Sequence, residues 1–153
     1  ALQLKRDVYS GRVDMLGEEH EETLRAANNY ANSLVDLERF EEAKALLRRT
    51  IPVTRRVLGD SSRTTLAQRC SYAESLYEDP GATLDDLREA VTTLEEVERI
   101  ARRVLGGAHP LTVDIELEVR DARAALRARE EAASGDVSAL CEALEAMPPG
   151  DAN

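Results

Sequence analysis

The chain has 153 residues and a formal net charge of −10, because 30 acidic residues face 20 basic ones. This length suits one domain or a short array of small units, and it can bury a core without disulfides or metal ions. The acidity argues against nucleic acid binding, which needs a basic footprint, and against an anionic membrane surface, which would repel the chain. We expect a soluble protein that binds neither nucleic acid nor a membrane surface. Its acidity fits a basic partner.

The apolar residues are mostly Leu, Ala and Val, with one Phe, four Tyr and no Trp. This composition favours helices that pack closely through small side chains over a β-sandwich built on aromatic and β-branched runs. Pro and Gly are few and fall between periodic segments. The sequence therefore predicts an all-α fold.

A Leu-Gly pair followed by similar letters occurs three times along the chain. The copies read LGEEHEETL from Leu16, LGDSSRTTL from Leu58 and LGGAHPLTV from Leu105, at intervals of 42 and 47 residues. The longer interval contains a turn around Asp79-Pro80-Gly81. Repeats of this length are typical of solenoids, in which each unit is a helix pair that packs on its neighbours.

Residues 1–15 align with the second helix of a preceding unit, so the chain opens half-way through a repeat. This half repeat, and an Ala where an initiator Met would stand, lead us to expect a module of a longer chain. Unit one follows at 16–57, and its two apolar stripes recur at steps of three and four residues, the spacing of a helix face. We expect Pro52 to kink its second helix, because proline removes one backbone donor.

Unit two spans 58–104 and, like unit one, ends its second helix in the letters RRVLG. Cationic side chains in a last turn, followed by glycine, are a helix stop signal. Residues 105–133 then predict the first helix of unit three, which starts near Pro110. Residues 134–153 predict a C-terminal capping helix and tail, with Asp136 as N-cap.

Few residues suit catalysis or metal binding. We expect Cys70 and Cys141 to be free thiols buried in the core, in the cytoplasm or another reducing compartment. His20 and His109 occupy the same repeat position just before a helix, which predicts a structural role such as capping. No second ligand lies at metal-ligand spacing, so we expect no metal, no cofactor and no enzyme activity.

Three residues of unit one carry a family resemblance. Ala31 and Ala43 stand at the close-contact positions of a helix pair, and Phe40 is an aromatic residue at the start of the second helix. With these residues, the chain from about residue 1 to residue 127 resembles a tetratricopeptide repeat protein. The letters LGEEHEETL, NNYANSL and RFEEAKALLRR resemble the kinesin light chain type of repeat in particular. The resemblance implies a right-handed α-solenoid of about three units. The tail letters AASGDVSALCEALEA also resemble, faintly, the start of an ankyrin repeat.

In such arrays the first helices line a concave surface, so the resemblance implies where a ligand would bind. The implied positions in unit one are Arg25, Asn28, Asn29, Asn32 and Asp36. The equivalent positions in units two and three are Ala67, Cys70, Ser71, Glu74, Glu78, Asp114, Leu117, Glu118 and Asp121. Asparagine amides can pair with the backbone of an extended peptide. The alternative is that the asparagines are solvated, or that one of them bridges two helices.

The candidate contact set for a partner is Arg25, Asn28, Asn29, Asn32, Asp36, Glu74, Glu78 and Asp121. The charged residues at the implied positions are one basic and six acidic. This balance disfavours a clamp for a terminal carboxylate and favours a neutral or basic peptide. We expect a protein–protein interaction scaffold or adaptor, within a larger complex. The alternative is a small structural subunit that docks through its convex face or its ends.

Overall fold

The computed structural model describes residues 1–147, which form six α-helices and, within that range, no strand. The all-α expectation is confirmed. The helices are α1 (Leu2–Leu16), α2 (Glu21–Asp36), α3 (Phe40–Leu58), α4 (Arg63–Tyr77), α5 (Leu84–Leu105) and α6 (Pro110–Glu145).

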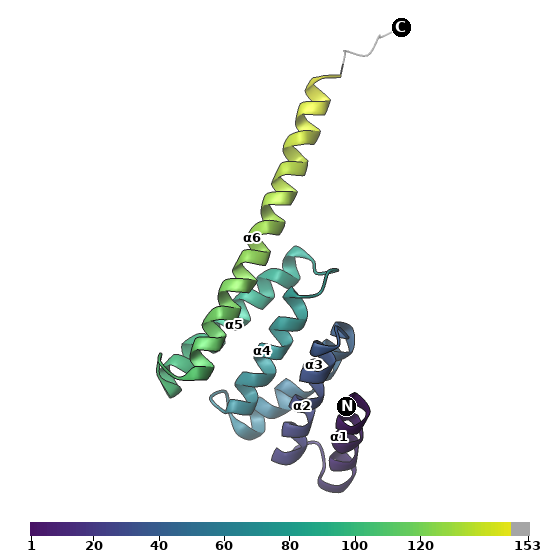
Figure 1. The fold of residues 1–153 in the computed structure, drawn as a ribbon, viewed down its shortest axis with the longest axis vertical. Helices are drawn as coiled ribbons and strands as arrows, with labels where there is room; N and C mark the ends of the chain where they lie inside the picture. The colour runs from purple at the N-terminus through teal and green to yellow at the C-terminus, as the bar shows by residue number, and fades with distance from the viewer. Residues whose placement is uncertain (148–153) are drawn as a thin grey trace.

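The helices stack as a helical solenoid (Figure 1). Each helix packs on the next one in the chain, and in addition α2 contacts α4 and α4 contacts α6. Among the described residues, the backbones of α1, α3 and α5 do not approach one another in this way, and α1 meets α3 only through side chains such as Tyr9 and Arg49. The layer of α2, α4 and α6 is therefore the more closely packed one. We take the face that it turns away from α1, α3 and α5 as the concave side of the array.

The helices end where the sequence places their stop signals. Gly59 and Gly106 follow α3 and α5 with φ values of 86° and 89°, a left-handed conformation that glycine adopts without a Cβ penalty. Both helices carry paired arginines in the last turn, where positive charge complements the helix dipole. Pro52 lies inside α3 without ending it; a kink there stays a prediction.

Three helix starts, those of α2, α5 and α6, are capped by side chains. The Nδ1 atom of His20 accepts a hydrogen bond of 3.2 Å from the backbone N–H of Glu22, and Nδ1 of His109 accepts one of 3.1 Å from Leu111. The capping role predicted for the two histidines is confirmed. Helix α5 begins with a reciprocal capping box between Thr83 and Asp86.

The core consists of two clusters, one built by α1, α2 and α3 and the other by α4, α5 and α6. Alanines with no exposed surface, such as Ala31 and Ala43, let the helices approach closely. Tyr72 packs against both clusters and joins them. Gln68 adds a polar link, because its Nε2 donates to the backbone oxygen of Leu24 and its Oε1 accepts from Thr54.

Two sequence predictions about the C-terminal part are wrong. Helix α6 runs from Pro110 to Glu145 without a break, so the separate capping helix from residue 134 does not exist. Gly135 costs a helix only about 1 kcal/mol relative to Ala, and the strong helix formers around it outweigh that cost. Residues 127–147 are all exposed and cover no end of the array, and Cys141 among them is an exposed thiol rather than a core one. Residues 148–153 of the expected tail lie outside the described residues.

Candidate protein interface on the concave face

The three inner helices bring most of the predicted contact positions to one side of the molecule. We call this surface the concave face and define it by the positions predicted on α2 (residues 25–36), α4 (residues 67–78) and α6 (residues 114–121). The side chains there differ strongly in burial and in their partners. Whether they contact a ligand stays a prediction.

On α2, three of the five predicted residues are exposed, and Asn28 and Asn32 are half-buried. Arg25, Asn29 and Asp36 are exposed, and Arg25 forms an ion pair of 2.6 Å with Glu21 one turn earlier. Asn28 is half-buried, and its Oδ1 atom is buried without a hydrogen-bond partner in the described part of the chain. Because this oxygen is closed to solvent, an incoming backbone N–H reaches it only after the amide turns outward.

Asn32 links two inner helices. Its Oδ1 atom accepts a hydrogen bond of 2.5 Å from the hydroxyl of Ser71 on α4. The same hydroxyl lies 3.0 Å from the backbone oxygen of Ala67. The alternative in which one asparagine bridges two helices is therefore correct for Asn32, and its amide nitrogen is the group that remains for a ligand.

The middle of the concave face holds two half-buried carboxyl groups, Glu74 on α4 and Glu118 on α6. Burial, followed by the negative charges of Glu78 and Asp36, raises the pKa of Glu74 to about 7. Burial, followed by the charges of Glu74, Asp114, Glu78 and Asp121, raises the pKa of Glu118 to about 7. One Glu118 oxygen, Oε2, is buried without a hydrogen-bond partner in residues 1–147.

The other acidic side chains belong to the same electrostatic environment. Burial, followed by the charges of Glu38, Asp121 and Asp36, raises the pKa of Glu78. Every charge that perturbs Glu74, Glu78 and Glu118 is negative. The carboxylates predicted on three different helices therefore do gather on one face, and together they form a site that favours positive charge.

Two further residues complete this face. Tyr77, which the sequence analysis missed, is half-buried, and burial together with the charges of Glu118 and Glu74 raises the pKa of its phenol. It lies three residues after Glu74, a helical step that could have indicated it. Burial likewise raises the pKa of the Cys70 thiol, which makes it a weak nucleophile.

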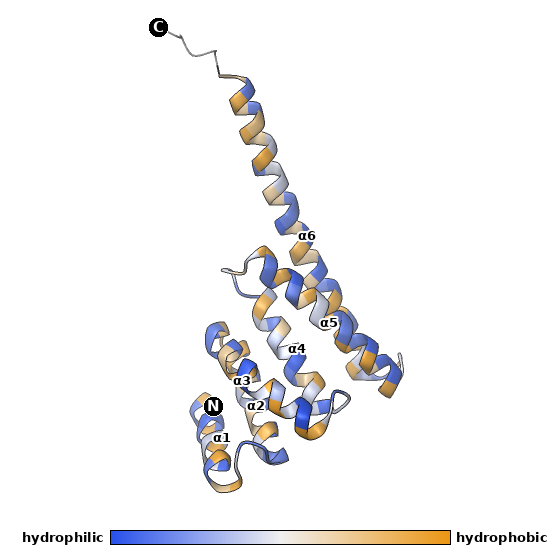
Figure 2. Cartoon of the chain, turned by 180° about the vertical axis from the view of Figure 1, so that it is seen from behind, coloured by the Kyte–Doolittle hydropathy of each residue, from blue (hydrophilic) through white to orange (hydrophobic). Residues whose placement is uncertain are grey.

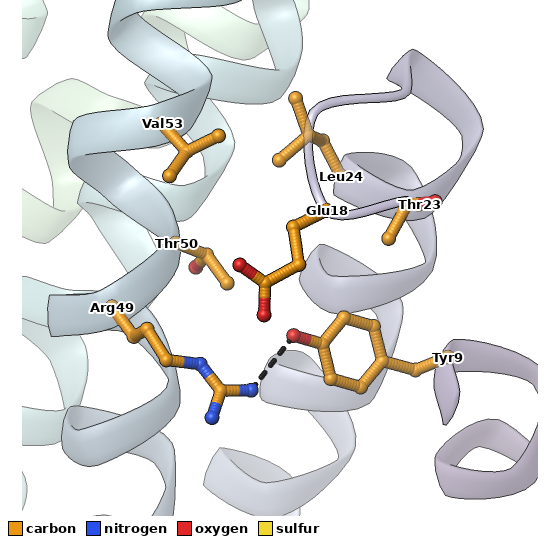
Figure 3. Close-up of a pocket in the computed structure, with 7 residues that line it drawn as sticks. All are labelled: Tyr9, Glu18, Thr23, Leu24, Arg49, Thr50 and Val53. Atoms are coloured by element: carbon orange, nitrogen blue, oxygen red, sulfur yellow. Dashed lines mark hydrogen bonds between the residues drawn. The ribbon is translucent and has the colours of Figure 1, made fainter. Parts of the chain in front are cut away.

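An enclosed cavity lies elsewhere, between α1, α2 and α3 (Figure 3). It is lined by Tyr9, Glu18, Arg49 and Thr50 among others, and Arg49 donates a hydrogen bond of 2.9 Å to the Tyr9 hydroxyl. Its volume is about 10 Å³, room for about one water molecule. We assign it to the packing of α1 on the repeat.

The described part of the chain lacks two other kinds of feature. In residues 1–147 no group of three or more His, Cys, Asp or Glu side chains is arranged to hold a metal ion. None of the helices in that range combines the length and apolarity needed to cross a membrane.

Comparison with known proteins agrees with the fold. Residues 23–64, which cover most of α2, all of α3 and the start of α4, match the family model of the tetratricopeptide repeat. Residues 23–64 thus form a repeat of the tetratricopeptide type within an all-helical array. Repeats of this family generally mediate protein–protein interactions as scaffolds without catalysis. No curated protein matches the chain significantly. The finer resemblance to kinesin light chain repeats stays a prediction.

Proposed function

We propose that the chain is an adaptor that binds a neutral or basic extended segment of another protein on its concave face. The observation that carries the proposal is the group of carboxyl groups from three helices, with Glu74 and Glu118 at its centre, that no basic side chain within residues 1–147 neutralises. A lysine or arginine of a partner would relieve the repulsion within this group. The asparagines of α2 would then form hydrogen bonds with the backbone of the same segment.

The amide groups of Asn28 and Asn32 suit an extended chain. Once its amide turns outward, Asn28 offers an oxygen that has no partner within residues 1–147, and Asn32 offers its amide nitrogen beside the bond from Ser71. The two residues lie one helical turn apart on α2, so they present an acceptor and a donor along one line. Such contacts are independent of the partner's side chains, and the acidic group supplies the charge preference.

The test uses two labelled peptides of equal length and apolar composition, one with lysine and the other with glutamate at alternate positions. We expect the lysine peptide to bind more tightly, and the preference to weaken as salt screens the charges. Equal binding of both peptides at low salt would contradict the proposal.

A matched pair of variants separates a local site from general attraction to an acidic protein. The groove variant carries Glu74→Gln, Glu78→Gln and Asp121→Asn, and the control carries Asp136→Asn, Glu142→Gln and Glu145→Gln on the exposed end of α6. Binding is measured above about pH 8, where Glu74 is mostly ionised, so that each set removes about three negative charges. We expect only the groove variant to lose the lysine peptide, and equal losses would show that the attraction is not local.

The alternative function is a structural subunit that docks through the end of the array. The exposed apolar side chains Leu4, Val8 and Met15 on α1 favour it. A partner captured from native extract distinguishes the two functions. If Leu4→Ala and Met15→Ala abolish its capture while the groove variant retains it, the end of the array is the docking surface.

A further inference from the structure

Beyond Glu130, which forms an ion pair of 3.6 Å with Arg88 of α5, the C-terminal part of α6 has no packing partner within the described residues. Residues 127–147 are exposed throughout, and this end of the helix projects beyond the other five helices (Figure 1). Three large apolar side chains of this part, Val137, Leu140 and Leu144, and Met147 two residues after the helix end, are between 59% and 65% exposed. Exposed apolar side chains grouped in this way indicate an interaction surface.

The apolar residues follow the spacing of a coiled-coil seam. The steps along the seam alternate between four and three residues, as between the a and d positions of a coiled coil. One position holds Val137 and Leu144, and the other holds Ala133, Leu140 and Met147. Figure 2 shows hydrophobic residues recurring along this part of α6. A seam with this spacing is complementary in shape to another helix that carries the same spacing, and so to itself.

The residues beside the seam bear on the choice of partner. The flanking positions are Ser134, Asp136, Cys141 and Ala143, of which only Asp136 is charged. A seam that selects a different protein normally carries charges at these positions, and a seam that rejects its own copy carries like charges there. This seam carries neither pattern, so an identical copy meets no row of like charges directly beside it, and the acidic Glu142 and Glu145 lie on the outer side of the helix.

The net charge favours one orientation of such a pair. Each chain carries a net charge of −10, and a parallel pair would place the two repeat arrays side by side. An antiparallel pair places them at opposite ends and opposes the two helix dipoles. Repulsion between the arrays is then smaller.

We propose that the C-terminal part of α6 is a homodimerisation helix that pairs antiparallel with the same segment of a second copy, Leu140 against the partner's Leu144. This surface is distinct from the concave face, which stays open in the dimer. Four large apolar side chains per copy make a small interface, so the dimer is weak and reversible.

Sedimentation equilibrium of the full chain from micromolar to millimolar concentration tests the proposal. We expect a reversible monomer–dimer equilibrium whose Kd rises at least about tenfold in Leu140→Ala/Leu144→Ala, since both side chains leave the seam. The control is Leu4→Ala/Met15→Ala, which removes two exposed apolar side chains from α1 and should leave the Kd unchanged. Circular dichroism checks that all three proteins are equally helical.

Three outcomes would overturn the proposal: a wild type that stays monomeric, a double α6 variant that dimerises as tightly as the wild type, or a control that weakens the dimer equally. The orientation has its own readout, because Cys70 is buried and Cys141 is exposed. A short bis-maleimide should join Cys141 to the partner's Cys141 in an antiparallel pair, where these positions lie on the same side of the seam. A sedimenting dimer that does not cross-link contradicts the antiparallel arrangement.

Discussion

The hydroxyl of Ser71 donates a hydrogen bond of 2.5 Å to Oδ1 of Asn32, across 39 residues of sequence. The bond joins α4 to α2 on the inner layer of the solenoid. An asparagine that weakens its own helix thus stabilises the contact between two repeats. Asn32 therefore has a structural role whether or not it also contacts a partner.

This bond predicts unequal effects of two neighbouring asparagine substitutions. Asn32→Ala should lower the free energy of unfolding by about 1 kcal/mol, because the bond between α4 and α2 is lost and the Ser71 hydroxyl retains only the backbone oxygen of Ala67 as an acceptor. Asn29→Ala should change it by less than about 0.5 kcal/mol, because Asn29 is exposed. Urea denaturation measures both values, and an Asn29 effect as large as that of Asn32 would be inconsistent with the geometry.

Gln68 should be one of the most sensitive positions in the chain. It is fully buried and bonds to Thr54 at 2.8 Å and to the Leu24 oxygen at 3.1 Å. Gln68→Ala should cost about 2–4 kcal/mol, since it removes both bonds and leaves a cavity. Gln68→Met retains the volume and should cost less, about 1–3 kcal/mol. Denaturation curves that show Gln68→Met and the wild type equally stable would exclude a role for the two bonds.

The raised pKa values of Glu74 and Glu118, both about 7, predict a pH dependence of stability. In the unfolded chain these groups titrate near their ordinary value, so the folded state binds more protons between about pH 4.5 and pH 7. Their contribution to stability is complete below that window and is lost as the pH rises through it. Glu118→Gln stays neutral, so it should be more stable than the wild type at about pH 8 and should lose that advantage at about pH 5.

Thermal denaturation of the wild type and Glu118→Gln at both pH values provides the comparison. Asp136→Asn, which changes an exposed carboxylate far from the concave face, is the control and should show no such crossover. If the difference between Glu118→Gln and the wild type does not change with pH, then Glu118 titrates normally and the carboxyl groups are not coupled.

The capping bond of His109 predicts different losses of stability in two variants. His109→Ala should cost about 1 kcal/mol, because the N–H of Leu111 loses its acceptor at the start of α6. His109→Asn should retain most of the stability, since asparagine accepts the same kind of bond. Equal losses in both variants, measured by urea denaturation, would show that the histidine stabilises the turn in some other way.

The fold was predictable because its signals are local and repeated. The apolar spacing, the Leu-Gly stops and the close-contact alanines each occur in more than one unit, so they support one another. The break expected at Ser134-Gly135 failed for the opposite reason. It rested on one local signal, and the helix formers on both sides of Gly135 outweighed it.

The positions of the candidate site residues were predictable, but their burial and their hydrogen bonds were not. Helical register places Glu74 and Asp121 on the inner layer, and the repeat aligns them. The burial of Glu74 and Glu118 depends on how α4 packs against α6, and the bond from Ser71 to Asn32 depends on how α4 packs against α2. Neither packing contact has a signal within a single repeat.

The most direct test of the central claim is an NMR titration of the ¹⁵N-labelled chain with the lysine peptide. The proposal predicts shift changes at residues 25–36, 67–78 and 114–121, including the side-chain amides of Asn28 and Asn32, with α1, α3 and α5 unaffected. Shift changes confined to α1, or to the exposed end of α6, would contradict the claim that the concave face binds the partner.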